Sequence, residues 1–116
     1  MLFRSGTILK HQHSISDVYA NDASMLSGVV QKFNEWDSQG HKIILVTARK
    51  ESTRAITEQQ LREFGIAWDQ LVMGVGGGTR VLINDKLDKN DADRAIGVNV
   101  VTNAGFSSVS WEDYDL

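Results

Sequence analysis

The chain has 116 residues and contains neither cysteine nor proline. The lack of cysteine excludes disulfide frameworks, thiolate zinc sites and cysteine nucleophiles. Long apolar runs are also missing, since none approaches the roughly 20 residues of a membrane span, and no signal-peptide core precedes a cleavage site. We therefore expect a cytoplasmic protein that does not enter a membrane.

Positive charge is scarce and dispersed. The chain has 12 Lys and Arg residues against 15 Asp and Glu residues, which gives a net charge of −3. Binding to nucleic acid or to an anionic membrane needs clustered basic residues, so we expect neither partner. A chain of this length forms one domain with a single core and has no room for an added cap domain.

Two segments have the periodicity of amphipathic helices. The first follows N-cap candidates at residues 21–24 and ends near Gly40. The second spans residues 51–64 and stops at Gly65. Their expected apolar faces are Met25, Leu26, Val29, Val30, Phe33 and Trp36 in the first segment, and Ile56, Leu61 and Phe64 in the second. On the second helix we interpret the spaced charges of Glu51, Arg54 and Glu58 as a solvated face.

Strand signals alternate with these helices. They lie at residues 41–47, 70–73, 81–83 and 96–101. The alternation predicts an α/β fold, of the three-layer Rossmann-like kind, with a mainly parallel sheet flanked by helices. We place a single domain at residues 1–102, followed by a polar and partly disordered tail at residues 103–116.

Two of the predicted strands end in residues that suit a binding site. IILVTAR (residues 43–49) and RVLINDK (residues 80–86) are apolar runs that stop at small polar or charged residues, and the carboxyl ends of parallel strands open into a ligand crevice. Thr47, with the backbone N–H groups of Ala48 and Arg49, can bind an oxyanion. Asp85 is a hard oxygen ligand that suits Mg²⁺. The alternatives are that Thr47 only ends a strand and that Asn84 and Asp85 form a turn.

The glycines of GVGGGTR (residues 74–80) are similar in spacing to those of a phosphate-binding loop. Such a loop works because a helix N-terminus follows it, whereas here we expect a strand. We interpret these glycines as the residues of a tight turn.

The two strand ends, together with QLREFGIAWDQLVMG between them (residues 60–74), resemble the haloacid dehalogenase-like (HAD) superfamily of phosphohydrolases, in particular its small capless members. In that family one strand ends in a Ser or Thr that binds the transferred phosphoryl group, and a later strand ends in acidic residues that hold Mg²⁺. The resemblance implies catalytic roles for Thr47 and Asp85, with Asn84 where a second carboxylate often stands as metal ligand. Arg80 is the nearest candidate for the family's basic residue, and a surface arginine is an equally good interpretation.

The family's first motif, D-x-D-G-T, is matched only in its second half. Gly6 and Thr7 fit, and the resemblance implies that they contribute to phosphate binding, but Phe3 and Ser5 stand where the two aspartates should be. A phenyl ring cannot attack phosphorus, and a serine without a base is a poor general acid. We favour a truncated or altered N-terminal sequence over natural degeneration.

The sequence therefore predicts a domain related to magnesium-dependent phosphatases of small phosphorylated metabolites that is inactive or crippled and binds Mg²⁺ weakly or not at all. The alternative is a non-catalytic domain of the same fold that binds a phosphorylated ligand or a protein. A receiver-like or flavodoxin-like module has less support, because neither a further acidic cluster nor a flavin-stacking loop is visible. The sequence does not indicate the oligomeric state.

Overall fold

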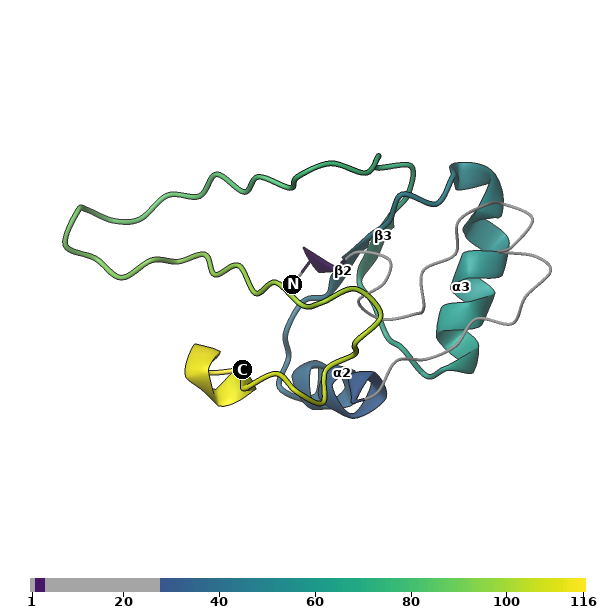
Figure 1. The fold of residues 1–116 in the computed structure, drawn as a ribbon, viewed down its shortest axis with the longest axis horizontal. Coiled ribbons are helices and arrows are strands. Elements are labelled where there is room, and N and C mark those ends of the chain that lie inside the picture. Colours follow the sequence, from purple (N-terminus) through teal and green to yellow (C-terminus); the bar gives the residue numbers. More distant parts are fainter. Residues whose placement is uncertain (1, 4–27) are drawn as a thin grey trace.

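The computed structural model of the chain describes residues 2–3 and 28–116, which form a small sheet with two α-helices packed against it (Figure 1). The elements follow one another as expected for an α/β fold. In order they are β1 (Leu2–Phe3), α2 (Val29–Ser38), β2 (Ile44–Val46), the 3-10 turn η1 (Glu51–Thr53), α3 (Arg54–Glu63), β3 (Gln70–Val72) and the 3-10 turn η2 (Trp111–Tyr114).

The sheet has three parallel strands in the order β1-β2-β3. Leu2 and Phe3 of β1 are in register with Ile44 and Leu45 of β2, and Leu45 is in register with Leu71 of β3. The strands predicted at residues 41–47 and 70–73 are confirmed, although β2 is shorter than expected. The segment from β2 through α3 to β3 is a parallel βαβ unit, so the α/β class is correct.

Both α-helices stop at the predicted glycines. After α2, the N–H of Gly40 donates to the carbonyl of Asp37 and that of His41 to the carbonyl of Trp36. Gly65 and Ile66 repeat this pattern after α3. This is the Schellman motif, which needs a residue with positive φ, and Gly40 and Gly65 have φ values of 81° and 76°. The chain therefore turns sharply back toward the sheet after each helix.

An aromatic cluster forms the centre of the core. Val29, Phe33 and Trp36 of α2 are fully or almost fully buried, as the helical period predicted. The ring of Trp36 meets the rings of Phe106 and Trp111 at centroid distances of 5.9 and 5.2 Å. Edge-to-face contacts of this kind add to the free energy of burial.

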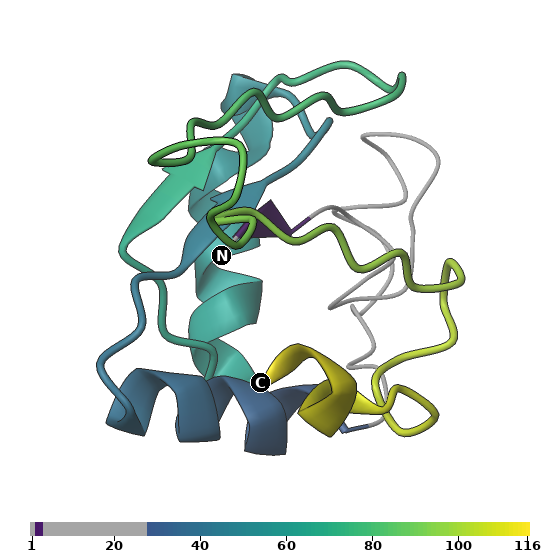
Figure 2. The same cartoon turned by 90° about the vertical axis from the view of Figure 1, so that its left-hand side faces the viewer.

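The predicted polar tail is part of this core. Phe106 is 3% exposed and Trp111 is 9% exposed, and the two rings lie 4.9 Å apart. A Cβ on Gly28, just before α2, would lie 3.2 Å from the backbone nitrogen of Ser107, so the two segments are in close contact. Figure 2 shows η2 beside α2. The expectation of a partly disordered tail at residues 103–116 is therefore wrong, because two large aromatic side chains anchor it.

The buried face of α3 matches the predicted one only in part. Leu61 is buried as expected, together with Thr53, Thr57 and Gln60, whereas Ile56 and Phe64 are only partly buried. A buried helix face made of polar side chains cannot be recognised from apolar periodicity in the sequence. Each α-helix has 10 residues, and within the described ranges no helix is long and apolar enough to cross a membrane.

The strands predicted at residues 81–83 and 96–101 are not formed. Residues 75–102, which we call the arm, contain no helix or strand. The chain runs out from the sheet and returns (Figure 1), and Val98 and Val100 on its return pack against the core. Val81, Leu82 and Ile83 are 79%, 62% and 92% exposed. A strand needs a partner for its backbone, and no backbone hydrogen bond joins residues 81–86 to another described residue. The sheet thus has three strands in the described residues, and the three-layer architecture stays a prediction.

We expect the substitution Phe106→Ala to lower the free energy of unfolding by about 3–5 kcal/mol, because it removes a buried ring and leaves a cavity. Ser108→Ala, at an exposed position of the same segment, should change it by no more than about 0.5 kcal/mol. Urea denaturation of both variants measures these changes. A Phe106→Ala variant as stable as the parent would show that residues 103–116 do not belong to the core.

Candidate functional site

The candidate site lies where the parallel strands end. Phe3, the last described residue of β1, is in register with Leu45, two residues before Thr47. β3 ends at Val72, in register with Val46. The carboxyl ends of the three strands therefore meet at one edge of the sheet, the place where open α/β sheets bind ligands.

The segment from Thr47 to Arg49 is fixed to the chain beyond β3. The N–H of Thr47 donates to the carbonyl of Val72 at 2.9 Å, and the N–H of Val75 donates to the carbonyl of Thr47 at 3.0 Å. The N–H of Gly74 donates to the carbonyl of Arg49 at 2.7 Å. These bonds continue the ladder past the end of the sheet, so the loop after β2 has a defined backbone conformation.

The hydroxyl group of Thr47 is held inside this loop. Thr47 is 7% exposed, and its Oγ1 accepts a hydrogen bond from the N–H of Arg49 at 3.1 Å. Ala48 is exposed, and its N–H makes no backbone hydrogen bond to another described residue. Two predicted oxyanion contacts, Thr47 and Ala48, thus lie together at the edge, while the N–H of Arg49 is already bonded to Thr47.

The guanidinium group of Arg49 is bound to α3. Its Nη1 donates to Thr57 Oγ1 at 3.0 Å and to Gln60 Oε1 at 2.8 Å. Burial lowers the pKa of Arg49 because desolvation disfavours the charged form, yet an arginine stays protonated in proteins. No sequence pattern predicts this contact, because Thr57 and Gln60 are polar residues on a buried helix face.

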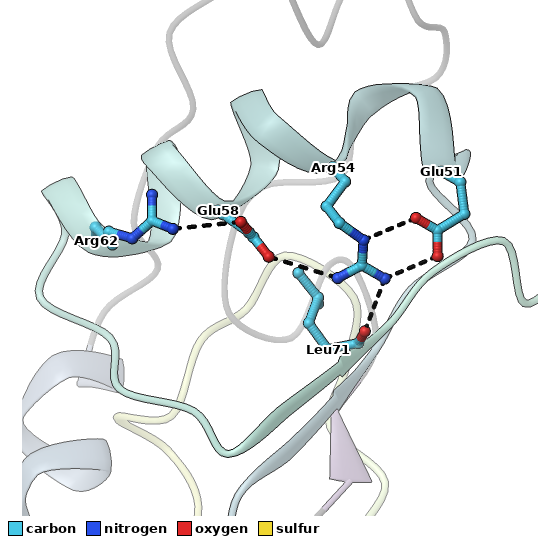
Figure 3. Close-up of polar contacts among 5 residues, drawn as sticks. All are labelled: Glu51, Arg54, Glu58, Arg62 and Leu71. Carbon is cyan, nitrogen blue, oxygen red and sulfur yellow. Dashed lines mark hydrogen bonds and ion pairs between the residues drawn. The ribbon is translucent and has the colours of Figure 1, made fainter.

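A second arginine connects α3 to β3 (Figure 3). Arg54 donates from Nε and Nη2 to the two carboxylate oxygens of Glu51, at 2.7 Å each, and from Nη2 to the carbonyl of Leu71 at 3.0 Å. Glu58 accepts from Arg54 at 3.5 Å and from Arg62 at 3.3 Å. The ion pairs confirm the charged helix face predicted for these residues. The bond to Leu71, which spacing alone could not reveal, fixes the start of α3 relative to the strand edge.

Arg80, the predicted basic residue, is bonded to its own loop. Its guanidinium group donates to the carbonyls of Gly76 at 2.7 Å, Gly78 at 3.1 Å and Val75 at 3.5 Å. The carbonyl oxygens of the glycine-rich segment thus bind the guanidinium group of Arg80. No helix follows this segment in the described residues up to η2. Both features agree with a turn and not with a phosphate-binding loop.

Asn84 and Asp85, the predicted metal ligands, are exposed in the arm. The side-chain amide of Asn84 donates to the carbonyl of Asp85 at 3.3 Å. Across residues 2–3 and 28–116 there is no group of three or more His, Asp or Glu side chains that could hold a metal. One exposed carboxylate does not meet the demand of Mg²⁺ for several oxygen ligands, so the described residues do not fit a magnesium site.

The predicted site is therefore only partly assembled. Thr47, Ala48 and Arg49 lie at the strand edge, whereas Arg80 and Asp85 belong to the part of the arm that runs out from the sheet (Figure 1). Gly6 and Thr7, the predicted phosphate-binding residues of the first motif, lie outside the described residues. The roles proposed for all of these residues stay predictions.

We expect the carboxyl group of Glu51 to titrate below its ordinary pKa of about 4.3, because the hydrogen bonds from Arg54 favour the charged form. A lowered carboxyl pKa contributes stability above the unfolded-state pKa, and this is lost as the pH falls through the folded-state value. In the variant Arg54→Ala the pKa of Glu51 should rise, which an NMR titration measures. Arg62→Ala, which removes contacts to Glu58 and Trp68 but none to Glu51, is the control, and an unmoved Glu51 pKa in Arg54→Ala would contradict the assigned cause.

A comparison with protein families matches residues 15–113 to the HAD superfamily, subfamily IIIB (Acid phosphatase). The matched range contains Thr47, Asn84 and Asp85, and it begins after Thr7. No curated protein and no solved structure matches the chain. Because the matched range covers well over half of the 116 residues, the chain belongs to the HAD superfamily, subfamily IIIB, the acid phosphatase family.

Proposed function

We propose that this domain binds the phosphoryl group of a small phosphorylated metabolite at the end of β2 and does not hydrolyse it. The observation that carries the proposal is the fixed Thr47–Arg49 loop at the strand edge, next to a β1 strand whose last described residue is Phe3. The proposal gives this loop the phosphoryl-binding role of a HAD-type site, and on the predicted register Phe3 stands where the first motif of the family has its nucleophile. The cytoplasmic location expected from the sequence stays a prediction.

Phosphoryl recognition at this loop depends on neutral donors. The hydroxyl of Thr47 and the N–H of Ala48 lie in a loop that three backbone hydrogen bonds hold in place. Donors that are already oriented cost little reorganisation when an anion binds. The 3-10 turn η1 and the helix α3 begin just after the loop, and the N-terminal end of a helix favours an anion.

Hydrolysis fails for two independent reasons. Covalent phosphoryl transfer needs a nucleophile, and neither Phe3 nor an unactivated Ser5 supplies one. It also needs a cation that neutralises charge on the transferred group, which Mg²⁺ supplies when it is bound. The single carboxylate of Asp85, exposed in the arm, supports weak binding of Mg²⁺ or none.

The chain should show no appreciable turnover of an aryl phosphate in the presence of Mg²⁺, and sustained release of product would contradict the proposal. The variant with Phe3→Asp and Ser5→Asp should gain Mg²⁺ binding, because it restores the two carboxylates of the family motif. Isothermal titration calorimetry measures this gain. The variant with Phe3→Asn and Ser5→Asn is the matched control, and equal binding by both variants would count against the assigned register.

We expect inorganic phosphate to bind the parent chain and shift the amide NMR signals of residues 47–49. Thr47→Val should weaken this binding about 10- to 100-fold, since a hydrogen bond to a charged group contributes about 1.5–3 kcal/mol. Thr47→Ser, which keeps the hydroxyl, should bind as the parent does. Thr102→Val removes an exposed hydroxyl elsewhere and serves as control. Unchanged affinity in a folded Thr47→Val variant would exclude Thr47 as a ligand.

A further inference from the structure

The buried face of α3 carries two polar side chains whose burial stability alone does not explain. Thr57 and Gln60 are 4% and 6% exposed, and because they are three residues apart they lie on one side of the helix. Apolar residues at these positions would avoid the cost of burying polar groups. Replacing both partners of a buried hydrogen bond by apolar groups can be nearly neutral for stability, whereas a buried hydrogen-bonded network fixes one geometry.

Both side chains bind the same group of Arg49. Its Nη1 donates to Thr57 Oγ1 at 3.0 Å and to Gln60 Oε1 at 2.8 Å. A terminal guanidinium nitrogen carries two hydrogens, so it can donate to both oxygens at once. Two acceptors on one side of α3 therefore fix the direction of the guanidinium group as well as its distance from the helix.

The backbone of Arg49 connects this attachment to the loop after β2. Its N–H donates to Thr47 Oγ1 at 3.1 Å, and its carbonyl accepts from the N–H of Gly74 at 2.7 Å. Just beyond it, the hydroxyl and the N–H of Thr53 both donate to the carbonyl of Lys50 at 2.8 Å. The loop is thus held from two sides, by the chain after β3 through its backbone and by α3 through the side chain of Arg49.

We propose that Thr57 and Gln60 are positioning residues of the phosphoryl-binding loop, and that they act through Arg49, whose side chain holds the loop and does not touch the ligand. This role rests on the phosphate binding proposed above for Thr47 and Ala48. Donors that are oriented before the ligand arrives lose less freedom on binding. The attachment to α3 therefore raises the affinity for phosphate without adding a contact to it.

The variant with Thr57→Val and Gln60→Met removes both acceptors and replaces them by apolar groups of similar size. It should bind inorganic phosphate about 2- to 10-fold more weakly than the parent chain, which corresponds to the cost of ordering a released side chain. The variant with Thr57→Ser and Gln60→Met keeps one acceptor and should recover part of the affinity. NMR titration of the amide signals of residues 47–49 measures these affinities.

The control for a loss of stability alone is Leu61→Val, which trims a buried apolar side chain of the same helix. This variant should bind phosphate as the parent does. Unchanged affinity in the folded variant with Thr57→Val and Gln60→Met, or an equal loss of affinity in Leu61→Val, would overturn the positioning role.

A third substitution separates positioning from direct contact. When Arg49→Met is added to Thr57→Val and Gln60→Met, the affinity should fall no further, because the three side chains act as one unit. A further loss would show that the guanidinium group itself binds phosphate. A gain in affinity on removal of the two acceptors would show that α3 withholds the guanidinium group from the ligand. Either result would overturn the proposal.

Hydrogen exchange without phosphate distinguishes this role from the proposed function. The amide of Gly74, which donates to the carbonyl of Arg49, should exchange faster in the variant with Thr57→Val and Gln60→Met than in the parent. The amide of His41, bonded to Trp36 after α2, should exchange equally in both. A parent that binds no phosphate would refute the proposed function, and exchange at Gly74 would then decide the positioning of the loop. Unchanged exchange at Gly74 would overturn that positioning.

Discussion

The pairing of β2 with a parallel strand on each side is the interaction on which the rest of the described structure depends. β2 has only three residues, and its central Leu45 is in register with both Phe3 and Leu71. Ile43 and Leu45 join the core to which both α-helices contribute. A short parallel sheet is stable only when helices cover it. The strand edge that holds Thr47 therefore exists because these helices and β2 stabilise one another.

The two arginines near this edge explain why recognition of an anion would fall to neutral groups. Arg49 is bonded to Thr57 and Gln60 on α3, and Arg54 is surrounded by Glu51 and Glu58. The hydrogen bonds with Glu51 raise the pKa of Arg54 above its ordinary range. Both arginines thus contribute to holding α3 in place. The charge of Arg49 faces the helix, and the charge of Arg54 is offset by two carboxylates.

Features that depend on neighbouring residues could be predicted from the sequence, and features that depend on distant contacts could not. Gly40 and Gly65 ended the helices as expected, because the Schellman motif is made within six residues. The prediction of a strand at the apolar residues 81–83 was wrong, because an apolar pattern does not show whether a neighbouring strand is available for pairing. Thr47 was placed correctly, since it depends only on β2. Phe106 and Trp111 were missed, because single aromatic residues without periodicity do not indicate burial.

The incomplete site and the exposed arm share one segment, residues 81–86. This segment forms no strand in the described residues, so its apolar side chains and Asp85 lie exposed in the arm. Thr47, by contrast, is held at the strand edge by backbone hydrogen bonds to the chain beyond β3. Of the two strand ends predicted to form the site, only the end of β2 is therefore fixed by a neighbouring strand in the described residues.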